Sequence, residues 1–228
     1  MKIGVVLPTF REDPTAAFAM AAEAAELGID GVFAYDHLYP MGSPERPALA
    51  PFPLLARIAV AHPQLCLGTL VARIGLVATD VLAAQFEALE ALSPGRTICA
   101  AGTGDRLSAQ ENLAWGVPVG SADARRHELE ALARDLGRRG REVWIGGGAP
   151  KTLAMAEAVG ATVNLWGATV EQVAEQAART TVSWAGVAPE GGSWGFGRLF
   201  EGLRGAGATW AVLGGPVDLE QIVAVSRA

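Results

Sequence analysis

The sequence has few of the residues that bind nucleic acids, and it lacks a segment that could cross a membrane. Only two lysines, Lys2 and Lys151, occur in 228 residues, and 24 acidic residues outnumber 18 basic ones. Because binding to a phosphate backbone needs a basic surface, this balance argues against a nucleic-acid partner. No uninterrupted apolar run reaches the length of a membrane span, so we expect no membrane partner.

Cysteine is also scarce. Cys66 and Cys99 lie in apolar stretches without a neighbour at metal-ligand spacing, so we expect buried, reduced thiols and no metal site. The opening MKIGVVLP is too short an apolar run for a signal peptide, which predicts a cytoplasmic protein. The preference for arginine over lysine is typical of a GC-rich bacterial genome.

Hydrophobic residues are abundant, at 50% of the chain, which is enough for a large core. Short apolar runs alternate with alanine-rich segments of helical periodicity. The runs predict strands over 3–7, 31–35, 65–71, 97–101, 142–145, 162–165, 181–185 and 209–213. The segments between them predict helices over 14–27, 53–61, 79–92, 124–136, 150–159, 170–179, 196–203 and 219–227.

Eight such units predict the fold class. The strands are continuous apolar runs, which indicates a parallel sheet covered on both faces. We therefore predict an α/β protein with one domain, 1–228, folded as a compact (β/α)8 TIM barrel. The alternative is an open doubly wound sheet, whose first turn should carry a glycine-rich phosphate loop, whereas this chain has Leu7-Pro8-Thr9-Phe10 there.

In a TIM barrel the chemistry gathers in the loops that follow the strands. Asp36 and His37 follow the second predicted strand. A histidine there can exchange a proton with a substrate near neutral pH. Alternatively, His37 could have only a structural role, in which it packs against Tyr35 or Tyr39.

Two glycine-rich turns follow later strands. Gly102-Thr103-Gly104-Asp105 would let a flat ligand approach the backbone and offers Asp105 as an acid or base, although an ordinary tight turn also explains it. Gly146, Gly147 and Gly148 lead into a helix that carries Lys151, a pattern suited to a phosphate; a flexible connection would seldom need three glycines. This set of residues, with no metal cluster, suggests an organic cofactor that performs redox chemistry.

Several short motifs occur in an order that resembles a known family. They are Met1-Lys2-Ile3-Gly4, Ala25-Glu26-Leu27-Gly28, Tyr35-Asp36-His37, Leu67-Gly68-Thr69, Leu92-Ser93-Pro94-Gly95-Arg96, Gly102-Thr103-Gly104, Trp144-Ile145-Gly146-Gly147-Gly148 and Asn164-Leu165-Trp166-Gly167. Together they resemble the bacterial luciferase-like monooxygenase superfamily of flavin- or deazaflavin-dependent oxidoreductases, and especially its coenzyme F420-dependent branch. The family fold is a (β/α)8 barrel.

The resemblance implies roles for particular residues. Asp36 and His37 would lie beside the deazaflavin ring with His37 as the acid or base, Asp105 would lie near the reacting carbon, and Leu70-Val71 would form a non-prolyl cis peptide behind the ring. Taken together, the residues expected to bind the cofactor are Asp36, Leu70, Val71, Gly102, Thr103, Gly104, Gly146, Gly147, Gly148, Lys151, Asn164, Trp166 and Gly167.

The chain departs from the family at several points. Relatives carry a long insertion between the fourth helix and the fifth strand, where this chain has only 137–141. Met41 replaces a tryptophan of the dehydrogenases in the branch, and their phosphate-gripping basic residues have no clear equivalents. Substrate identity therefore cannot be transferred from the family.

The expected function is hydride transfer between F420 and a small organic substrate. Three alternatives stay open: an FMN-dependent monooxygenase of the same family, a non-catalytic cofactor-binding relative, and an unrelated barrel that binds a phosphorylated metabolite at 146–151. A homodimer is expected only by analogy with the family.

Overall fold

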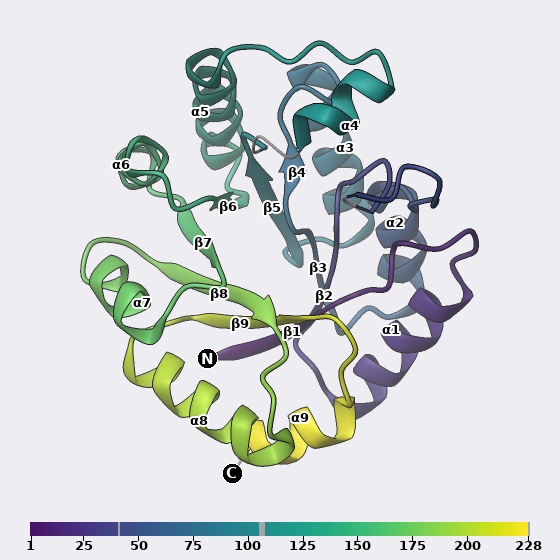
Figure 1. The fold of residues 1–228 in the computed structure, drawn as a ribbon, viewed down its shortest axis with the longest axis vertical. Helices are drawn as coiled ribbons and strands as arrows, with labels where there is room; N and C mark the ends of the chain where they lie inside the picture. Colours follow the sequence, from purple (N-terminus) through teal and green to yellow (C-terminus); the bar gives the residue numbers. More distant parts are fainter. Residues whose placement is uncertain (41, 105–107, 228) are drawn as a thin grey trace.

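The protein forms a closed barrel of parallel strands in the computed structural model, which describes residues 1–40, 42–104 and 108–227 (Figure 1). The strands are β1 (Lys2–Val6), β2 (Gly31–Ala34), β3 (Cys66–Thr69), β4 (Ala72–Arg73), β5 (Thr97–Gly102), β6 (Glu142–Gly146), β7 (Thr162–Trp166), β8 (Val182–Val187) and β9 (Trp210–Gly214). They pair in parallel in the order β3-β2-β1-β9-β8-β7-β6-β5-β4, and pairing of β3 with β5 closes the barrel. The predicted TIM barrel is confirmed.

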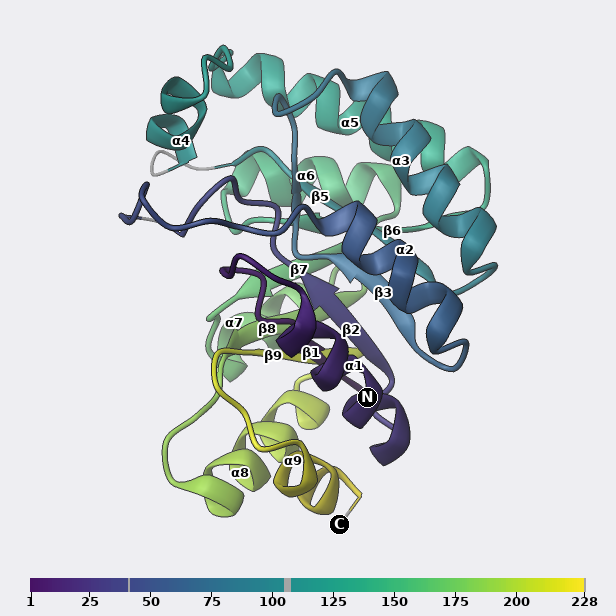
Figure 2. The ribbon, with the colours of Figure 1, turned by 90° about the vertical axis from the view of Figure 1, so that its right-hand side faces the viewer.

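Helices surround the barrel on its outer side (Figures 1 and 2). Within the described residues they are α1 (Thr15–Leu27), α2 (Pro51–Ala61), α3 (Thr79–Leu92), α4 (Ser108–Ala114), α5 (Ala122–Arg138), α6 (Pro150–Val159), α7 (Val170–Ala177), α8 (Gly192–Gly205) and α9 (Leu219–Ser226). Eight of them match predicted helices, although α8 begins four residues earlier than expected. Helix α4 was not predicted, and it lies on the same side of the barrel as the loop after β2 (Figure 2).

The strands are mostly apolar because each one packs on two faces. Side chains that point outward, such as Val32, Cys99 and Ile145, join the large cluster between the barrel and its helices. Those that point inward, such as Phe33 and Trp144, form a second cluster inside the barrel. Successive strand residues alternate between the two clusters, which is the period of two expected for a strand.

Large inner side chains are accommodated by glycines on neighbouring strands. A Cβ added to Gly4 would lie 2.6 Å from Phe33, and one added to Gly68 would lie 2.9 Å from the same ring. The rings of Phe33 and Trp144 stack with centroids 5.4 Å apart, and Trp210 meets Trp144 edge-on at 5.7 Å. These rings fill the interior of the barrel, next to the carboxyl ends of the strands where the candidate site lies.

The third predicted strand, 65–71, is interrupted in the structure. The Leu70–Val71 peptide bond is cis, as the family resemblance implied. It separates β3 from the two-residue strand β4, which pairs with the end of β5. Within the described residues, nine strand segments therefore form the eight strands of the barrel.

The α5–β6 connection and the two cysteines can be compared with the expectations from the sequence. Helix α5 ends at Arg138 and β6 begins at Glu142, so the short connection is confirmed. Both cysteines are free; Cys99 is buried, whereas Cys66 is only partly buried. No described residues form a cluster of metal-binding side chains. In the described part of the chain, no helix has both the length and the apolar character needed to cross a bilayer.

Candidate functional site

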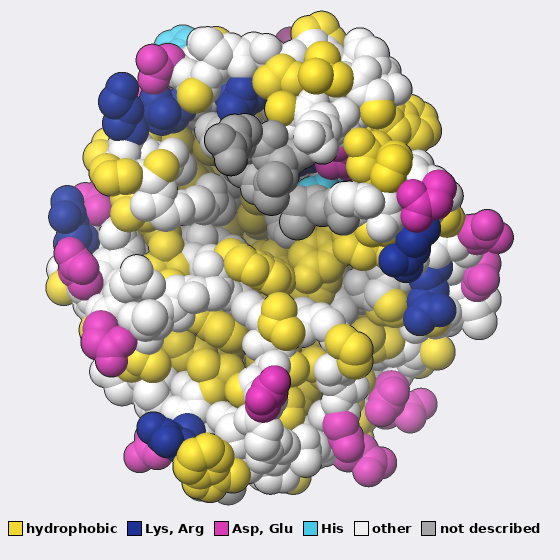
Figure 3. Space-filling model, viewed as in Figure 1, with side chains coloured by type: hydrophobic (Ala, Val, Ile, Leu, Met, Phe, Trp, Pro, Cys, Tyr) yellow, Lys and Arg dark blue, Asp and Glu magenta, His cyan; other side chains and the backbone are white. Residues whose placement is uncertain are grey.

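A cavity of about 590 Å³ opens at the carboxyl ends of the barrel strands. Figure 3 looks into it and shows a hollow with hydrophobic side chains in its centre. The lining residues come from the ends of β1 to β7 or the loops that follow them, and from α4 and α6: Phe10, Tyr35, His37, Leu70, Val71, Arg73, Gly102, Thr103, Gly104, Ser108, Gly146, Gly147, Gly148, Ala149, Thr152, Asn164 and Trp166. Most of the residues predicted to bind a cofactor are among them.

The floor of the cavity contains Leu70 and Val71. A Cβ added to Gly102 would lie 2.7 Å from Cγ2 of Val71, and one added to Gly146 would lie 2.9 Å from both of its methyl groups. Glycine at these two positions therefore makes room for Val71. The sequence analysis explained Gly102 by close approach of a flat ligand and Gly146 by a phosphate site, and the packing against Val71 supplies a second reason for both glycines.

Replacing Gly102 with alanine is expected to destabilise the fold by about 1–3 kcal/mol, because Val71 is branched at Cβ and can move only with its backbone. Gly137 on α5 is a matched control, since a Cβ there meets nothing within 4 Å. Gly137→Ala is expected to stabilise the protein by about 0.5–1 kcal/mol. Urea unfolding measures both variants, and equal effects would contradict the packing argument.

One end of the cavity has the features of an anion site. Gly147 has a φ of +129°, which side-chain-bearing residues rarely adopt, and a Cβ on Gly148 would meet nothing within 4 Å. Helix α6 begins after Ala149 without a side-chain cap. Pro150 has no N–H and the Thr152 N–H donates to the Ala149 carbonyl at 2.8 Å, so the Lys151 N–H and the positive end of the helix would face an anion. Thr152 on the first turn is 3% exposed and lines the cavity.

Two predicted cofactor-binding residues lie elsewhere. The side chain of Lys151 is 74% exposed, and its Nζ lies 3.7 Å from Asp123 on α5. Gly167 lines a separate cavity of about 510 Å³ between α6 and α7, which shares Gly148 and Trp166 with the first. Neither residue lines the central cavity.

Aromatic side chains form another wall of the central cavity. Phe10 stacks on Tyr35 with centroids 5.5 Å apart, and Trp166 meets Tyr35 edge-on at 6.0 Å. Burial raises the pKa of Tyr35 to about 12, so its phenol is neutral at physiological pH.

Asn164, another predicted cofactor-binding residue, also lines the cavity. It is buried and donates a hydrogen bond from Nδ2 to Ser183 Oγ at 3.0 Å.

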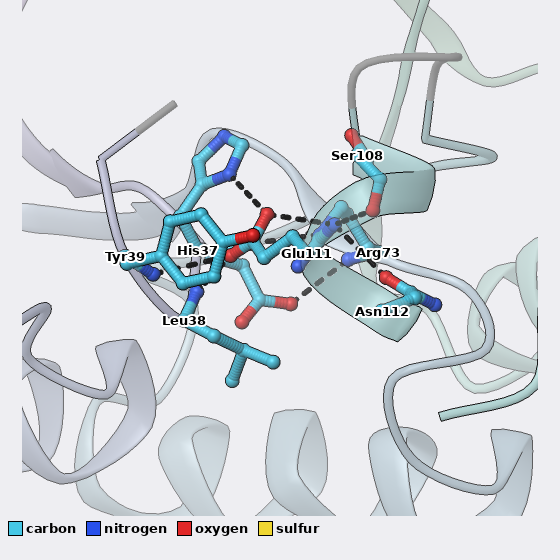
Figure 4. Close-up of polar contacts among 8 residues, drawn as sticks. His37, Leu38, Tyr39, Arg73, Ser108, Glu111 and Asn112 are labelled. Atoms are coloured by element: carbon cyan, nitrogen blue, oxygen red, sulfur yellow. Dashed lines mark hydrogen bonds and ion pairs between the residues drawn. The ribbon is translucent and has the colours of Figure 1, made fainter. Parts of the chain in front are cut away.

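His37 lies on the cavity wall and has one ring nitrogen engaged (Figure 4). Its Nδ1 is 2.9 Å from Oε2 of Glu111, and its side chain is 19% exposed. The other nitrogen, Nε2, has no hydrogen-bond partner among the described residues. His37 is therefore held by a carboxylate on one side and available to a ligand on the other.

Asp36, in the loop after β2, lies beside Arg73. Its Oδ2 accepts a hydrogen bond from the backbone N–H of Arg73 at 2.9 Å, and its carbonyl oxygen accepts from Arg73 Nε at 3.0 Å. Burial raises the pKa of Asp36, although the hydrogen bond from Arg73 works in the opposite direction. Asp36 is not among the residues that line the cavity, and its visible contacts tie the β2 and β4 loops together.

Glu111, a buried carboxylate, was not among the residues predicted from the sequence. Glu111 is 2% exposed and lies on α4 beside Asn112. Arg73 Nη1 is 3.0 Å from Glu111 Oε2 and 3.2 Å from Asn112 Oδ1. Although burial opposes ionisation, hydrogen bonds from His37 and Leu38 and the nearby Arg73 charge lower the pKa of Glu111.

The buried face of α4 does have a pattern in the sequence, but the pattern consists of polar residues. Ser108, Glu111 and Asn112 have the i, i+3, i+4 spacing of one helix face, and all three are buried. A search for apolar periodicity passes over a helix whose buried face is polar. The predicted acid Asp105 and the replacement residue Met41 lie outside the described residues.

Comparisons with known proteins give a consistent result. A family model described as luciferase-like monooxygenase matches residues 1–142. The F420-dependent hydroxymycolic acid dehydrogenase of Mycobacterium tuberculosis is 36% identical over 111 residues, which cover 47% of this chain and 30% of that protein. The F420-dependent glucose-6-phosphate dehydrogenase of Nakamurella multipartita is 30% identical over 138 residues, which cover 58% and 38% of the two chains.

A solved structure supports the fold. An F420-dependent secondary alcohol dehydrogenase, in complex with an F420–acetone adduct, matches with a TM-score of 0.80 over 98% of this chain and 96% of that chain, at 14% identity. At that identity the likeness concerns the fold alone. The matches to the two curated relatives span only 30% and 38% of their lengths. Since the family model covers more than half of the sequence, the chain belongs to the luciferase-like monooxygenase family.

Proposed function

We propose that this protein is an oxidoreductase that transfers a hydride between coenzyme F420 and a small organic substrate. The observation that carries the proposal is His37, whose Nε2 is available on the wall of a cavity that also contains an uncapped helix start and an open glycine loop. Both curated relatives are F420-dependent dehydrogenases, which supports the choice of cofactor.

The residues present fit a flavin-type cofactor with a phosphate. Backbone N–H groups near Gly148 and at the start of α6, together with Thr152, would hold the phosphate. Leu70 and Val71 would support the ring system from below. When bound, the deazaflavin supplies or accepts the hydride, which no side chain of this protein can do.

The chain itself would supply the proton transfer. In the oxidative direction His37 would accept the hydroxyl proton of the substrate at Nε2, and in the reductive direction it would return a proton to the carbonyl oxygen. The neutral phenol of Tyr35 and the ring of Phe10 would exclude water from one side of the cavity. Both Asp36 and Asp105 stay predictions as participants in the chemistry.

The cavity also supports a class of substrate. Arg73 is the only lysine or arginine among its described lining residues. Its Nη1 contacts Glu111 and Asn112, its Nη2 is buried without a hydrogen-bond partner in the described part of the chain, and the Glu111 carboxylate balances its charge. Among the described lining residues, a phosphorylated substrate would therefore find no cation that is both exposed and unpaired. We propose an uncharged alcohol, aldehyde or ketone, in contrast to the glucose 6-phosphate named for one relative.

Titration of the purified protein with F420 and with FMN tests the proposal directly. We expect saturable quenching of F420 fluorescence, weaker binding of FMN, and turnover with some alcohols or carbonyl compounds. Tight FMN binding without F420 binding would favour the monooxygenase alternative. Stoichiometric F420 binding without turnover would favour a non-catalytic relative. A homodimer and a cytoplasmic location stay predictions.

A pair of glycine variants locates the binding site. Gly147→Ala and Gly140→Ala both place a side chain at positive φ, +129° and +75° respectively, but only Gly147 lines the cavity. We expect Gly147→Ala to weaken F420 binding about tenfold, or by about 1.4 kcal/mol. Gly140→Ala should leave binding unchanged, and equal losses in both variants would point to general destabilisation.

A further inference from the structure

The carboxylate of Glu111 is placed to control which nitrogen of His37 carries the proton. The geometry points to Glu111 as a positioning residue that fixes the neutral imidazole of His37 in its Nδ1–H form and leaves Nε2 as the acceptor. The catalytic consequence rests on the proposed function, whereas the tautomer itself does not.

The contacts of the Glu111 carboxylate show which atom donates in its hydrogen bond with His37. Its Oε2 lies 2.9 Å from His37 Nδ1 and 3.0 Å from Arg73 Nη1. Its Oε1 accepts from the backbone N–H of Leu38, and from that of Tyr39 at 3.3 Å. An ionised carboxylate can only accept hydrogen bonds, so Nδ1 must be the donor in its contact with Glu111.

Arg73 keeps Glu111 in the ionised form. Its guanidinium is always charged, and it is 5% exposed, so its attraction for the carboxylate is little screened by water. Arg73 is in turn held by the carbonyl oxygen of Asp36 and by Asn112. Glu111, which contacts His37, is thus itself held by Arg73, and Arg73 is held by Asn112, as Figure 4 shows.

This arrangement serves proton transfer at Nε2. A neutral ring with hydrogen on Nδ1 has its lone pair on Nε2, where it can take a proton from a substrate hydroxyl. The imidazolium that forms is then stabilised by the Glu111 carboxylate. The carboxylate–histidine pair of serine proteases works by the same principle, in which the acid sets the tautomer and stays ionised.

The variant Glu111→Gln removes the charge and preserves the size of the side chain. Glutamine offers one acceptor oxygen, whereas four donors point at this site from His37, Arg73, Leu38 and Tyr39. Its amide NH2 must therefore face some of them, and opposite Nδ1 it would favour the Nε2–H form. We expect a change of tautomer and a fall in kcat of about 10- to 1000-fold, with KM changed only a few-fold.

Nitrogen-15 NMR of the histidine side chains measures the tautomer without cofactor or substrate. Spectra are recorded on the full, cofactor-free chain at about pH 8, where imidazole is mostly neutral. The chain has three histidines, so His37→Gln assigns the His37 signals and the other two serve as references. We expect one Nδ1–H tautomer for His37 in the wild type and a mixed or Nε2–H state in Glu111→Gln.

Glu130→Gln is the charge-matched control. Glu130 lies on α5 and pairs with Arg134 near the surface, so its loss should move neither the His37 signals nor kcat. Glu111→Asp keeps the charge and is expected to recover the Nδ1–H form at least in part. If Glu111→Gln does not fold, the wild type and Glu111→Asp still decide the question.

Three results would overturn the inference: an Nε2–H or mixed tautomer in the wild type, an unchanged tautomer in Glu111→Gln, or a lower melting temperature as the only effect of that variant. Failure of the proposed function is a separate outcome, because it would appear as absent F420 binding or turnover in the wild type. The tautomer can be measured in either case.

Discussion

Replacing His37 with alanine is expected to lower kcat by about 100- to 10,000-fold, because the substrate proton loses its acceptor. Cofactor binding should change only a few-fold, since the glycine loop and the start of α6 are untouched. Initial rates with F420 and an alcohol, together with an F420 titration, separate the two effects. Added imidazole should restore part of the rate by entering the space that the side chain leaves.

His127→Ala is the control for this experiment, since His127 is exposed on α5. Its turnover should equal that of the wild type. Wild-type rates in His37→Ala would remove the acid–base role of His37 from the proposed mechanism. A large loss of F420 binding would instead mean that His37 mainly contacts the cofactor.

Replacing Trp144 with alanine is expected to lower the free energy of unfolding by about 3–5 kcal/mol. Trp144 is fully buried inside the barrel, where it stacks on Phe33 and contacts Trp210 edge-on. The neighbouring strands are hydrogen-bonded on both sides and cannot close over the space. Urea unfolding followed by far-UV circular dichroism gives the change.

Trp194 on α8 offers a matched substitution at the surface. It is 69% exposed, and its ring contacts Arg198 at 5.0 Å. Trp194→Ala should cost less than about 1 kcal/mol, since an exposed cation–π contact contributes little. Comparable losses in the two variants would mean that the interior cluster does not stabilise the barrel as argued.

The architecture could be predicted because each strand is buried on two faces. A run such as that of β5, mostly apolar and buried at every position, fits a parallel sheet between a barrel interior and a helical layer. The end of each strand then locates the cavity, which is why His37 and the Gly146–Gly148 turn could be named without coordinates. The interruption between β3 and β4 could not be predicted from the polarity of residues 65–71, which form a mostly apolar run. The cis peptide bond there was predicted only from the family resemblance.

The contacts within the site could not be predicted in the same way. Lys151 lies on the first turn of α6, next to Thr152, which lines the cavity. Its side chain nevertheless faces α5, because neighbouring helix positions point in directions about 100° apart. Helix α4 was missed because its inward face carries Ser108, Glu111 and Asn112 rather than apolar residues. The helix is polar on that side where it meets Arg73 and His37.

The contact between His37 and Glu111 joins residues 74 positions apart in the chain. This separation sets the smallest segment that could be transplanted between related barrels with the site intact. A graft of the β2 loop alone would carry the histidine without its acceptor, and a graft that stops at β5 would fail in the same way. Chimeras should therefore exchange β2 through α4 as one block, from Gly31 to Ala114.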